Sequence, residues 1–277
     1  MKAWHVKVLY LGKITYNLSL RWTAGMPPLS EDQDFLMSAP YLGFLLQSPG
    51  NNIMVDTGIS EKFIVDGKAW GGFPAEGGKS YLVAALEKQG VTPSDIDTII
   101  YTHLHNDHAA NSTLFTNARV IFQRDEWQNL QNPLPVQLIR KDYDQNVIEE
   151  LRQMNCIMIE GDLELFDGIK VYKSPGHTLG SQVVAVNTKK GVVALLGDLC
   201  LYNFQIFPGT TDIIDMEGNK HNIPPAPSIF GPAVPSAIVY DYYSFYDSIY
   251  KVKAIATRNE PGYLIPGHEP SLVITGI

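Results

Sequence analysis

Residues 102–109 read Thr-His-Leu-His-Asn-Asp-His-Ala and place three of the chain's seven histidines and one carboxylate in one short segment. The candidate ligands in this segment are His103, His105, Asp107 and His108. Imidazole nitrogens combined with a carboxylate oxygen suit a borderline metal ion such as zinc. The segment follows a buried strand expected at residues 96–101. It therefore predicts a metal site at a strand end.

Three more residues of ligand type follow predicted strands in the same way. His177 follows a strand expected at residues 169–172, Asp198 ends a strand expected at 192–196, and His268 follows a strand at 263–265. A single histidine of this kind is usually a hydrogen-bonded loop residue. Ligand types at several strand ends nevertheless favour a metal site, because loops at strand ends can converge on one point. His5 and His221 lie outside the pattern.

The whole chain has the composition of an ordinary globular protein, with 277 residues, 45% hydrophobic and 18% charged. We expect a single domain over residues 1–277, because one large two-layer core can hold a chain of this length. Residues 203–235 are rich in proline and glycine. They predict an irregular cap at about residues 202–235, since a compact domain usually keeps such an excursion for function.

Composition also restricts partners and location. No segment approaches the roughly 20 apolar residues that span a bilayer, and the alternating first ten residues favour a strand over a secretory signal. Two distant cysteines, Cys156 and Cys200, fit a reducing cytoplasm. A net charge of -8 without a basic cluster argues against nucleic acid as a partner. We expect a soluble, cytoplasmic protein, and its acidity alone names no substrate.

The remaining sequence patterns predict strands followed by helices in the first part of the chain and the same order again in the second part. The first part of the chain predicts a hairpin at 41–47 and 53–55, a loop at 66–79, a helix at 80–89, a strand at 120–123 and helices at 124–131 and 142–153. The second part predicts a meander at 157–159, 163–166 and 169–172, a hairpin at 182–187 and 192–196, and a helix at 244–258. Two similar halves packed sheet on sheet explain this order.

The order His-X-His-X-Asp-His, Gly-His, Gly-Asp and Gly-His resembles the pattern of the metallo-β-lactamase superfamily, from Asp56 to His268. The resemblance implies an α/β fold, a four-layer αββα sandwich with a two-metal site on one edge. It implies that His103, His105 and His177 hold one metal and that Asp107, His108 and His268 hold the other, with Asp198 bridging. Asp56 would orient the ligand loop; a simple turn-capping role is the alternative.

Electrostatics explains why such a ligand set suits hydrolysis. Two divalent ions about 3.5–4 Å apart need anionic oxygen between them, which Asp198 and a hydroxide would provide. With Asp107 included, the site keeps a net charge of about +1, which favours a carbonyl that becomes an oxyanion. Metal binding lowers the pKa of water to about 7 and so supplies a nucleophile. Zinc is the expected metal, and iron, manganese and cobalt remain open.

Individual positions distinguish the branches of the superfamily. His105 replaces the glutamate of the oxygen-reducing branch, and Asp198 replaces the cysteine or histidine of the commonest β-lactamases. Nuclease and thioester-hydrolase branches bind anionic substrates through basic residues, which are scarce after Asp198. The chain is most similar to the N-acyl homoserine lactonases. The similarity lies in Asp56-Thr57-Gly58, residues 102–111, Ser-Pro-Gly-His177-Thr-Leu-Gly-Ser and Pro-Gly-His268-Glu-Pro.

This resemblance implies a quorum-quenching hydrolase that opens a lactone or related ester through a metal-bridging hydroxide. Asp107 would pass a proton to the leaving group or serve as a ligand only. Tyr202 is the nearest match to a tyrosine that polarises the lactone carbonyl, one residue farther from Asp198 than expected; packing is the alternative. A thioester or phosphodiester hydrolase remains open, as does a non-catalytic metal-binding module.

Aromatic residues gather after the bridging aspartate. The chain has 14 tyrosines and 11 phenylalanines, and ten of these residues lie between Tyr202 and Tyr250. They could line a groove for the apolar portion of a small-molecule substrate, bury a homodimer contact or belong to the core of a helix. The sequence pattern favours none of these three uses over the others.

Overall fold

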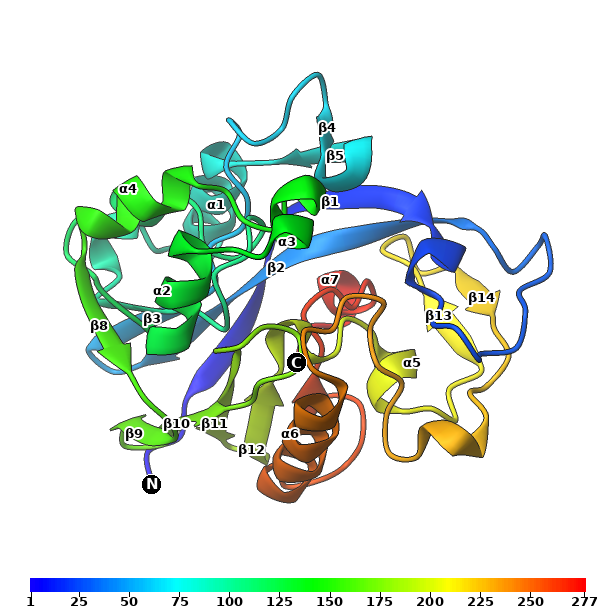
Figure 1. Cartoon of the computed structure of the whole chain (residues 1–277). Helices are drawn as coiled ribbons and strands as arrows, with labels where there is room; N and C mark the ends of the chain where they lie inside the picture. Colours follow the sequence, from blue (N-terminus) through cyan, green and yellow to red (C-terminus); the bar gives the residue numbers. More distant parts are fainter.

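Two β-sheets form the centre of the computed structural model, which describes residues 1–277 (Figure 1). The first sheet has the strand order β4-β5-β1-β2-β3-β6-β7-β8 and the second β15-β12-β11-β10-β9. The strands of the first sheet are β1 (His5–Asn17), β2 (Leu36–Ser48), β3 (Asn51–Val55), β4 (Lys68–Ala69), β5 (Phe73–Gly77), β6 (Thr98–Ile100), β7 (Arg119–Gln123) and β8 (Asn155–Ile159). Those of the second are β9 (Leu163–Phe166), β10 (Ile169–Lys173), β11 (Gln182–Thr188), β12 (Gly191–Leu195) and β15 (Leu264–Ile265).

Helices cover the outer face of each sheet, so the chain forms four layers (Figure 1). The helices are α1 (Lys79–Glu87), α2 (Arg124–Gln131), α3 (Pro135–Arg140), α4 (Asn146–Arg152), α5 (Asn203–Ile206), α6 (Tyr242–Ile255) and α7 (Leu272–Thr275). Core residues of α1, α2 and α4 pack on the first sheet, and those of α6 pack on the second. This arrangement confirms the predicted αββα sandwich.

Side-chain alternation along the strands explains how both faces of the first sheet are buried. Successive residues of a strand point to opposite faces. Leu45 and Met54 therefore pack toward the helices, whereas their neighbours Phe44 and Ile53 join the core between the two sheets. All four side chains are at most 1% exposed. A strand that is apolar on both faces fits only the middle of such a sandwich.

The predicted meander at residues 157–172 is wrong in its first member. β8 pairs in parallel with β7 and closes the edge of the first sheet, whereas β9 and β10 pair in the second sheet. The chain crosses between the sheets at residues 160–162. A three-residue connection between two β-patterned runs looks the same in sequence whether it closes a hairpin or joins two sheets.

Two further differences concern local structure. Residues 66–79, expected as an irregular loop, contain β4 and β5, and β5 pairs with β1 at the sheet edge. The sequence pattern predicted no helix between the helices at 124–131 and 142–153, yet Pro135 begins α3, where its missing N–H costs no hydrogen bond. The predicted cap at residues 202–235 contains α5 and the pair β13 (Asp212–Ile214) and β14 (Lys220–Asn222).

The topology places the candidate ligands at one edge. β3 and β6 are parallel, as are β12 and β15, so their carboxyl ends point the same way within each pair. The segments that follow these strands begin at Asp56, Tyr101, Leu196 and Pro266. Each of them carries one or more of the residues predicted to bind or orient metal. None of the helices is both long and apolar enough to cross a membrane.

Candidate metal centre

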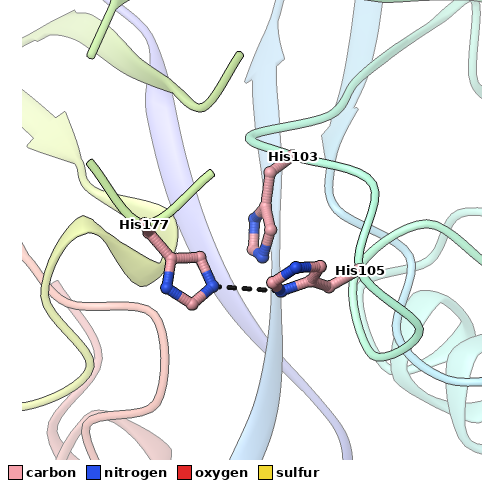
Figure 2. Close-up of side chains that lie close together, drawn as sticks. All are labelled: His103, His105 and His177. Carbon is pink, nitrogen blue, oxygen red and sulfur yellow. Dashed lines mark hydrogen bonds between the residues drawn. The ribbon is translucent and has the colours of Figure 1, made fainter. Parts of the chain in front are cut away.

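His103, His105 and His177 come together as the first candidate ligand group (Figure 2). The Nδ1 atom of His105 lies 3.0 Å from Nε2 of His177. Two nitrogens bound to one tetrahedral ion at the usual 2.0–2.1 Å would stand about 3.3 Å apart. The Nε2 atom of His103 is buried and has no hydrogen-bond partner. A buried nitrogen without a partner, beside two others at this spacing, fits a metal ion.

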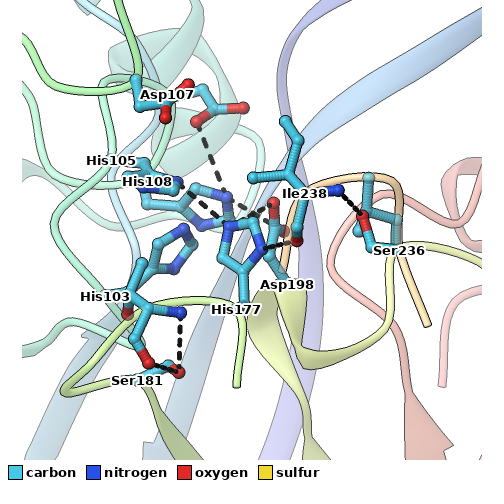
Figure 3. Close-up of polar contacts among 12 residues, drawn as sticks. His103, His105, Asp107, His108, His177, Ser181, Asp198, Ser236 and Ile238 are labelled. Atoms are coloured by element: carbon cyan, nitrogen blue, oxygen red, sulfur yellow. Dashed lines mark hydrogen bonds and ion pairs between the residues drawn. The ribbon is translucent and has the colours of Figure 1, made fainter. Parts of the chain in front are cut away.

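Asp107, His108 and His268 form a second group, and His103, His108 and Asp198 form a third that joins the two. The two carboxylate oxygens of Asp198 face different groups. Figure 3 shows Asp198 close to His108 and His177. Its Oδ1 lies 3.2 Å from Nε2 of His108 and 3.0 Å from Nε2 of His268, whereas its Oδ2 lies 3.4 Å from Nε2 of His177. This is the geometry that a bridging carboxylate requires.

Hydrogen bonds outside the centre orient three of the histidine rings. Nδ1 of His108 lies 2.8 Å from Oδ2 of Asp56, Nδ1 of His177 lies 3.0 Å from the carbonyl oxygen of Ile238, and Nδ1 of His268 lies 2.8 Å from that of Pro40. Each acceptor fixes the proton on Nδ1 and leaves the Nε2 lone pair for the centre. All seven predicted ligands thus converge, and their role as ligands stays a prediction.

The two groups differ in their electrostatic state. Burial lowers the pKa of His105 and of His177 to about 4, so both rings are neutral near pH 7 and offer a lone pair. Burial also lowers the pKa of His108 and His268, but nearby carboxylates, Asp198 foremost, outweigh it and raise both values. The carboxylates of the second group therefore favour positive charge at His108 and His268, which protons supply and which a bound cation would supply in their place.

Asp56 forms the hydrogen bonds expected of a residue that orients the ligand loop. It follows β3 in a left-handed conformation, with φ of 55°, which is uncommon outside glycine. Besides its bond to His108, its carboxylate accepts hydrogen bonds from the backbone N–H of Thr102 at 2.8 Å and from the Thr102 hydroxyl at 2.7 Å. The end of β3 is thereby joined to the start of the ligand loop.

Two glycines permit the close approach of the ligand segments. Gly197 has φ of 52°, and a Cβ there would lie 2.6 Å from Oγ1 of Thr102. A Cβ on Gly267 would lie 2.7 Å from Oδ1 of Asp198. Any larger residue at either position would push the ligand segments apart. Steric crowding therefore explains why a glycine precedes Asp198 and His268.

Glu126, the third residue of α2, is a residue that sequence reasoning missed. Its fully buried carboxylate accepts hydrogen bonds from the backbone N–H of Leu104 and of Gly180, both at 2.9 Å, and from the Thr178 hydroxyl. It thus joins the loop that carries His103 and His105 to the loop that carries His177. A glutamate that begins a helix looks like an ordinary first-turn residue, so the sequence contains no signal for this role.

A cavity of about 460 Å³, counting the part open to solvent, lies beside the candidate ligands. Its wall includes Ile14 and Tyr16 of β1, Tyr41 of β2, and Trp70 of the short helix Trp70–Gly72. None of the ten aromatic residues between Tyr202 and Tyr250 lines it. Of these ten, Tyr202, Phe204 and Phe245 belong to the core, whereas Tyr242, Tyr243 and Tyr250 are exposed. The cap aromatics therefore do not form a groove beside the ligands.

Tyr202 lies behind the cavity wall. Its side chain is completely buried, and its hydroxyl forms a hydrogen bond with the hydroxyl of Tyr16. Tyr16 is the member of the pair that lines the cavity. The ring of Tyr202 therefore packs in the core, which was the alternative to a catalytic role. A catalytic role for its hydroxyl stays a prediction.

Comparison with known proteins agrees with this geometry. Residues 42–124 match the family model of the metallo-beta-lactamase superfamily. An N-acyl homoserine lactonase of Bacillus cereus is 32% identical over 168 residues, which cover 58% of this chain and 64% of the relative. The N-acyl homoserine lactonase AttM of Azorhizobium caulinodans is 28% identical over 192 residues, which cover 64% of this chain and 72% of the relative.

Solved structures share the whole fold. An N-acyl homoserine lactone hydrolase with N-hexanoyl-L-homoserine at its catalytic metal centre superposes with a TM-score of 0.70 at 24% identity, covering 97% of this chain and 94% of that one. The dizinc quorum-quenching lactonase AidC superposes with a TM-score of 0.67 at 18% identity, covering 92% and 85%. The fold is that of the metallo-β-lactamase superfamily. In sequence, the chain is similar to N-acyl homoserine lactonases, and the match spans 64% of the length of the Bacillus relative.

Proposed function

We propose that this protein is a dinuclear metal-dependent hydrolase that opens a lactone of the N-acyl homoserine lactone type or a related ester. The observation that carries the proposal is the carboxylate of Asp198, whose two oxygens face two separate ligand groups. A carboxylate in this position can hold two cations close together. The similarity to N-acyl homoserine lactonases supports the choice of a lactone.

Two divalent ions, when bound, would polarise the substrate carbonyl and supply a water nucleophile at neutral pH. The residues of the chain provide the rest. Asp56 and the carbonyl groups of Ile238 and Pro40 hold the histidine rings in register, so no reorientation is needed when substrate arrives. Zinc is the metal that we propose, since nitrogen and carboxylate ligands in these groups suit it.

Asp107 and the tyrosine pair are the groups that we propose for proton transfer and carbonyl polarisation. Asp107 lines the cavity with its side chain 20% exposed, which is more than any of the six other proposed ligands. A partly exposed carboxylate can pass a proton to the leaving alkoxide. The Tyr16 hydroxyl can donate to the substrate carbonyl, and Tyr202 would act through its bond to Tyr16.

A metal-loaded preparation tested on a substrate panel distinguishes the candidate reactions. The panel contains N-acyl homoserine lactones of several chain lengths, an acyl thioester and a phosphodiester, and metal content is measured in parallel. We expect about two metal ions per chain and preferential opening of lactones. Preferential cleavage of the thioester or phosphodiester would replace the lactone assignment.

Two variants test the site itself. We expect His105→Ala to lose metal and activity together, because it removes a ligand of the first group. We expect Asp107→Asn to lower activity strongly. Full activity with full metal content in either variant would remove this mechanism. Absence of transition metal after purification without chelators would favour a non-catalytic binding module.

Three finer properties are proposals of the same kind. We propose a single domain with a cytoplasmic location, which two free cysteines favour. We also propose a homodimer, because α6 presents Tyr243 with 88% of its surface exposed, beside the exposed Tyr242 and Tyr250. Analytical ultracentrifugation of the wild type and of Tyr243→Ser would test the dimer, and a monomeric wild type would overturn it.

A further inference from the structure

Arg21 is a cationic residue in the cavity wall, and the proposed reaction assigns no role to it. It ends the short helix Leu18–Arg21 directly after β1, and only 8% of its surface is exposed. It lines the same cavity as Asp107, Asp198 and His268. Its guanidinium therefore lies beside the candidate metal centre although it belongs to none of the ligand groups.

The charge of Arg21 is not paired directly with a carboxylate, although the effect of burial is outweighed by Tyr16 and Asp198, which lie near enough to stabilise the charge and raise its pKa. No carboxylate forms an ion pair with it, and its buried Nε has no hydrogen-bond partner. Asp142, the other carboxylate of the wall besides Asp107 and Asp198, is paired with Arg140 at 2.5 Å and accepts a hydrogen bond from Nε1 of Trp70 at 3.1 Å. A buried charge without a directly paired carboxylate is costly, so a group that neutralises it would bind favourably.

Aromatic rings hold the guanidinium in place. Its central carbon lies 4.4 Å from the centre of the Trp70 ring and 5.1 Å from that of Tyr16. Stacking of this kind stabilises a cation without using its N–H donors. Apart from a contact with the Tyr16 hydroxyl, the donors of Arg21 thus remain available to a ligand in the cavity, and the planar group suits a carboxylate.

We propose that Arg21 binds an anionic group, a carboxylate in the first instance, on the part of the substrate that is not cleaved. This inference rests on the proposed function, because it places the cleaved bond at the candidate metal centre. It also changes the substrate expected from the sequence. The scarcity of basic residues after Asp198 seemed to disfavour anionic substrates, whereas the cation comes from a residue near the start of the chain.

A matched set of lactones tests the proposal. Homoserine lactone is acylated with succinate, glutarate or adipate, and each compound is compared with its methyl ester, which removes only the charge. We expect the metal-loaded wild type to have a higher kcat/KM for the acids than for the esters. In Arg21→Gln, kcat/KM for the preferred acid should fall about 10- to 150-fold, mainly through KM, with the ester changed less than about threefold.

Control variants separate charge recognition from folding. Arg21→Lys keeps the positive charge and should recover part of the preference. Arg152→Gln removes an exposed guanidinium that pairs with Glu149, and it should leave both substrates unchanged. The thermal unfolding midpoint of Arg21→Gln shows whether a general loss of activity reflects damage to the fold. Equal loss for acid and ester in a stably folded Arg21→Gln would overturn the proposal.

Calorimetry with glutarate gives a readout that does not depend on turnover. We expect glutarate to bind the metal-loaded wild type at least about tenfold more tightly than Arg21→Gln, while any binding to the metals is common to both. Equal binding to the two proteins would overturn the anion site. If the wild type opens no lactone but binds glutarate through Arg21, the anion site is supported and the lactonase proposal fails.

Discussion

Glu126→Gln should weaken metal binding without removing any metal ligand. In the wild type, Oε2 of Glu126 accepts the N–H of Leu104, and Oε1 accepts the N–H of Gly180 together with the Thr178 hydroxyl. A glutamine has only one carbonyl oxygen. Whichever way its amide is turned, the NH₂ group faces a backbone N–H and leaves that buried donor without an acceptor.

The structure allows the size of the effect to be estimated. A buried donor left without an acceptor costs about 1–3 kcal/mol, and that is the expected loss in the free energy of unfolding. The two loops that Glu126 joins carry His103, His105 and His177. Since loss of an outer hydrogen bond that orients metal ligands typically lowers metal affinity about 10- to 100-fold, we expect a decrease in that range.

Two measurements test this reasoning. Urea unfolding of the chelated protein gives the change in stability, and competition with a chromogenic chelator at pH 7.5 gives the change in zinc affinity. Glu160→Gln is the matched control, because Glu160 is 73% exposed at its side chain and only pairs with Arg124 on the surface. Loss of stability with wild-type zinc affinity would refute the idea that Glu126 holds the ligand loops in register.

Three further predictions concern other parts of the chain. Gly267→Ala should displace Asp198 and reduce metal content measured by mass spectrometry, whereas Gly209→Ala, with open space around its Cβ, should not. Burial acts to raise the pKa of Asp215, but hydrogen bonds, that of His221 foremost, outweigh it and lower the pKa to about 2. The ionised carboxylate therefore stabilises the fold above the unfolded pKa near 4, and this stabilisation is lost as the pH falls toward 2. Asp215→Asn should therefore destabilise by about 1 kcal/mol at pH 6 and by less at pH 3 in urea unfolding. Burial raises the pKa of the Cys156 thiol to about 11 and also raises that of Cys200, so Ellman's reagent should label the native protein far more slowly than the unfolded one.

The ligand set could be predicted from sequence because its signal is local. His103, His105, Asp107 and His108 share one segment, and the remaining ligands each follow a strand whose apolar pattern is clear. The role of Asp56 was implied by the family resemblance, with turn capping as the alternative. The structure supplies a physical reason for the contact, because a residue that ends one parallel strand meets the residues that follow its neighbour. The candidate ligands could therefore be predicted mainly from their positions at the ends of strands.

Partners that act through the backbone, or from distant segments, could not be predicted. The carbonyl groups of Pro40 and Ile238 orient His268 and His177, but a carbonyl group is present at every residue and gives no pattern. A substrate groove was one of three uses left open for the aromatic residues after Asp198, and the cavity wall lies elsewhere. Enrichment in tyrosine does not distinguish a core position such as Tyr202 from a cavity position such as Tyr16. Burial is decided by the packing of the two sheets, which the sequence of one segment does not describe.

Under the proposed function, reaction and substrate choice would depend on different parts of this fold. The strands that precede every candidate ligand except His268 lie inside the two sheets, where apolar residues fix the position of each strand end. Much of the cavity wall comes instead from β1, from the helix that ends at Arg21 and from the helix that begins at Trp70, all near the edge formed by β4 and β5. Edge segments have fewer neighbours to hold them in one place. If the proposed function holds, we expect a change of side chain at Arg21 or Trp70 to alter the substrate preference while the positions of the candidate ligands stay the same.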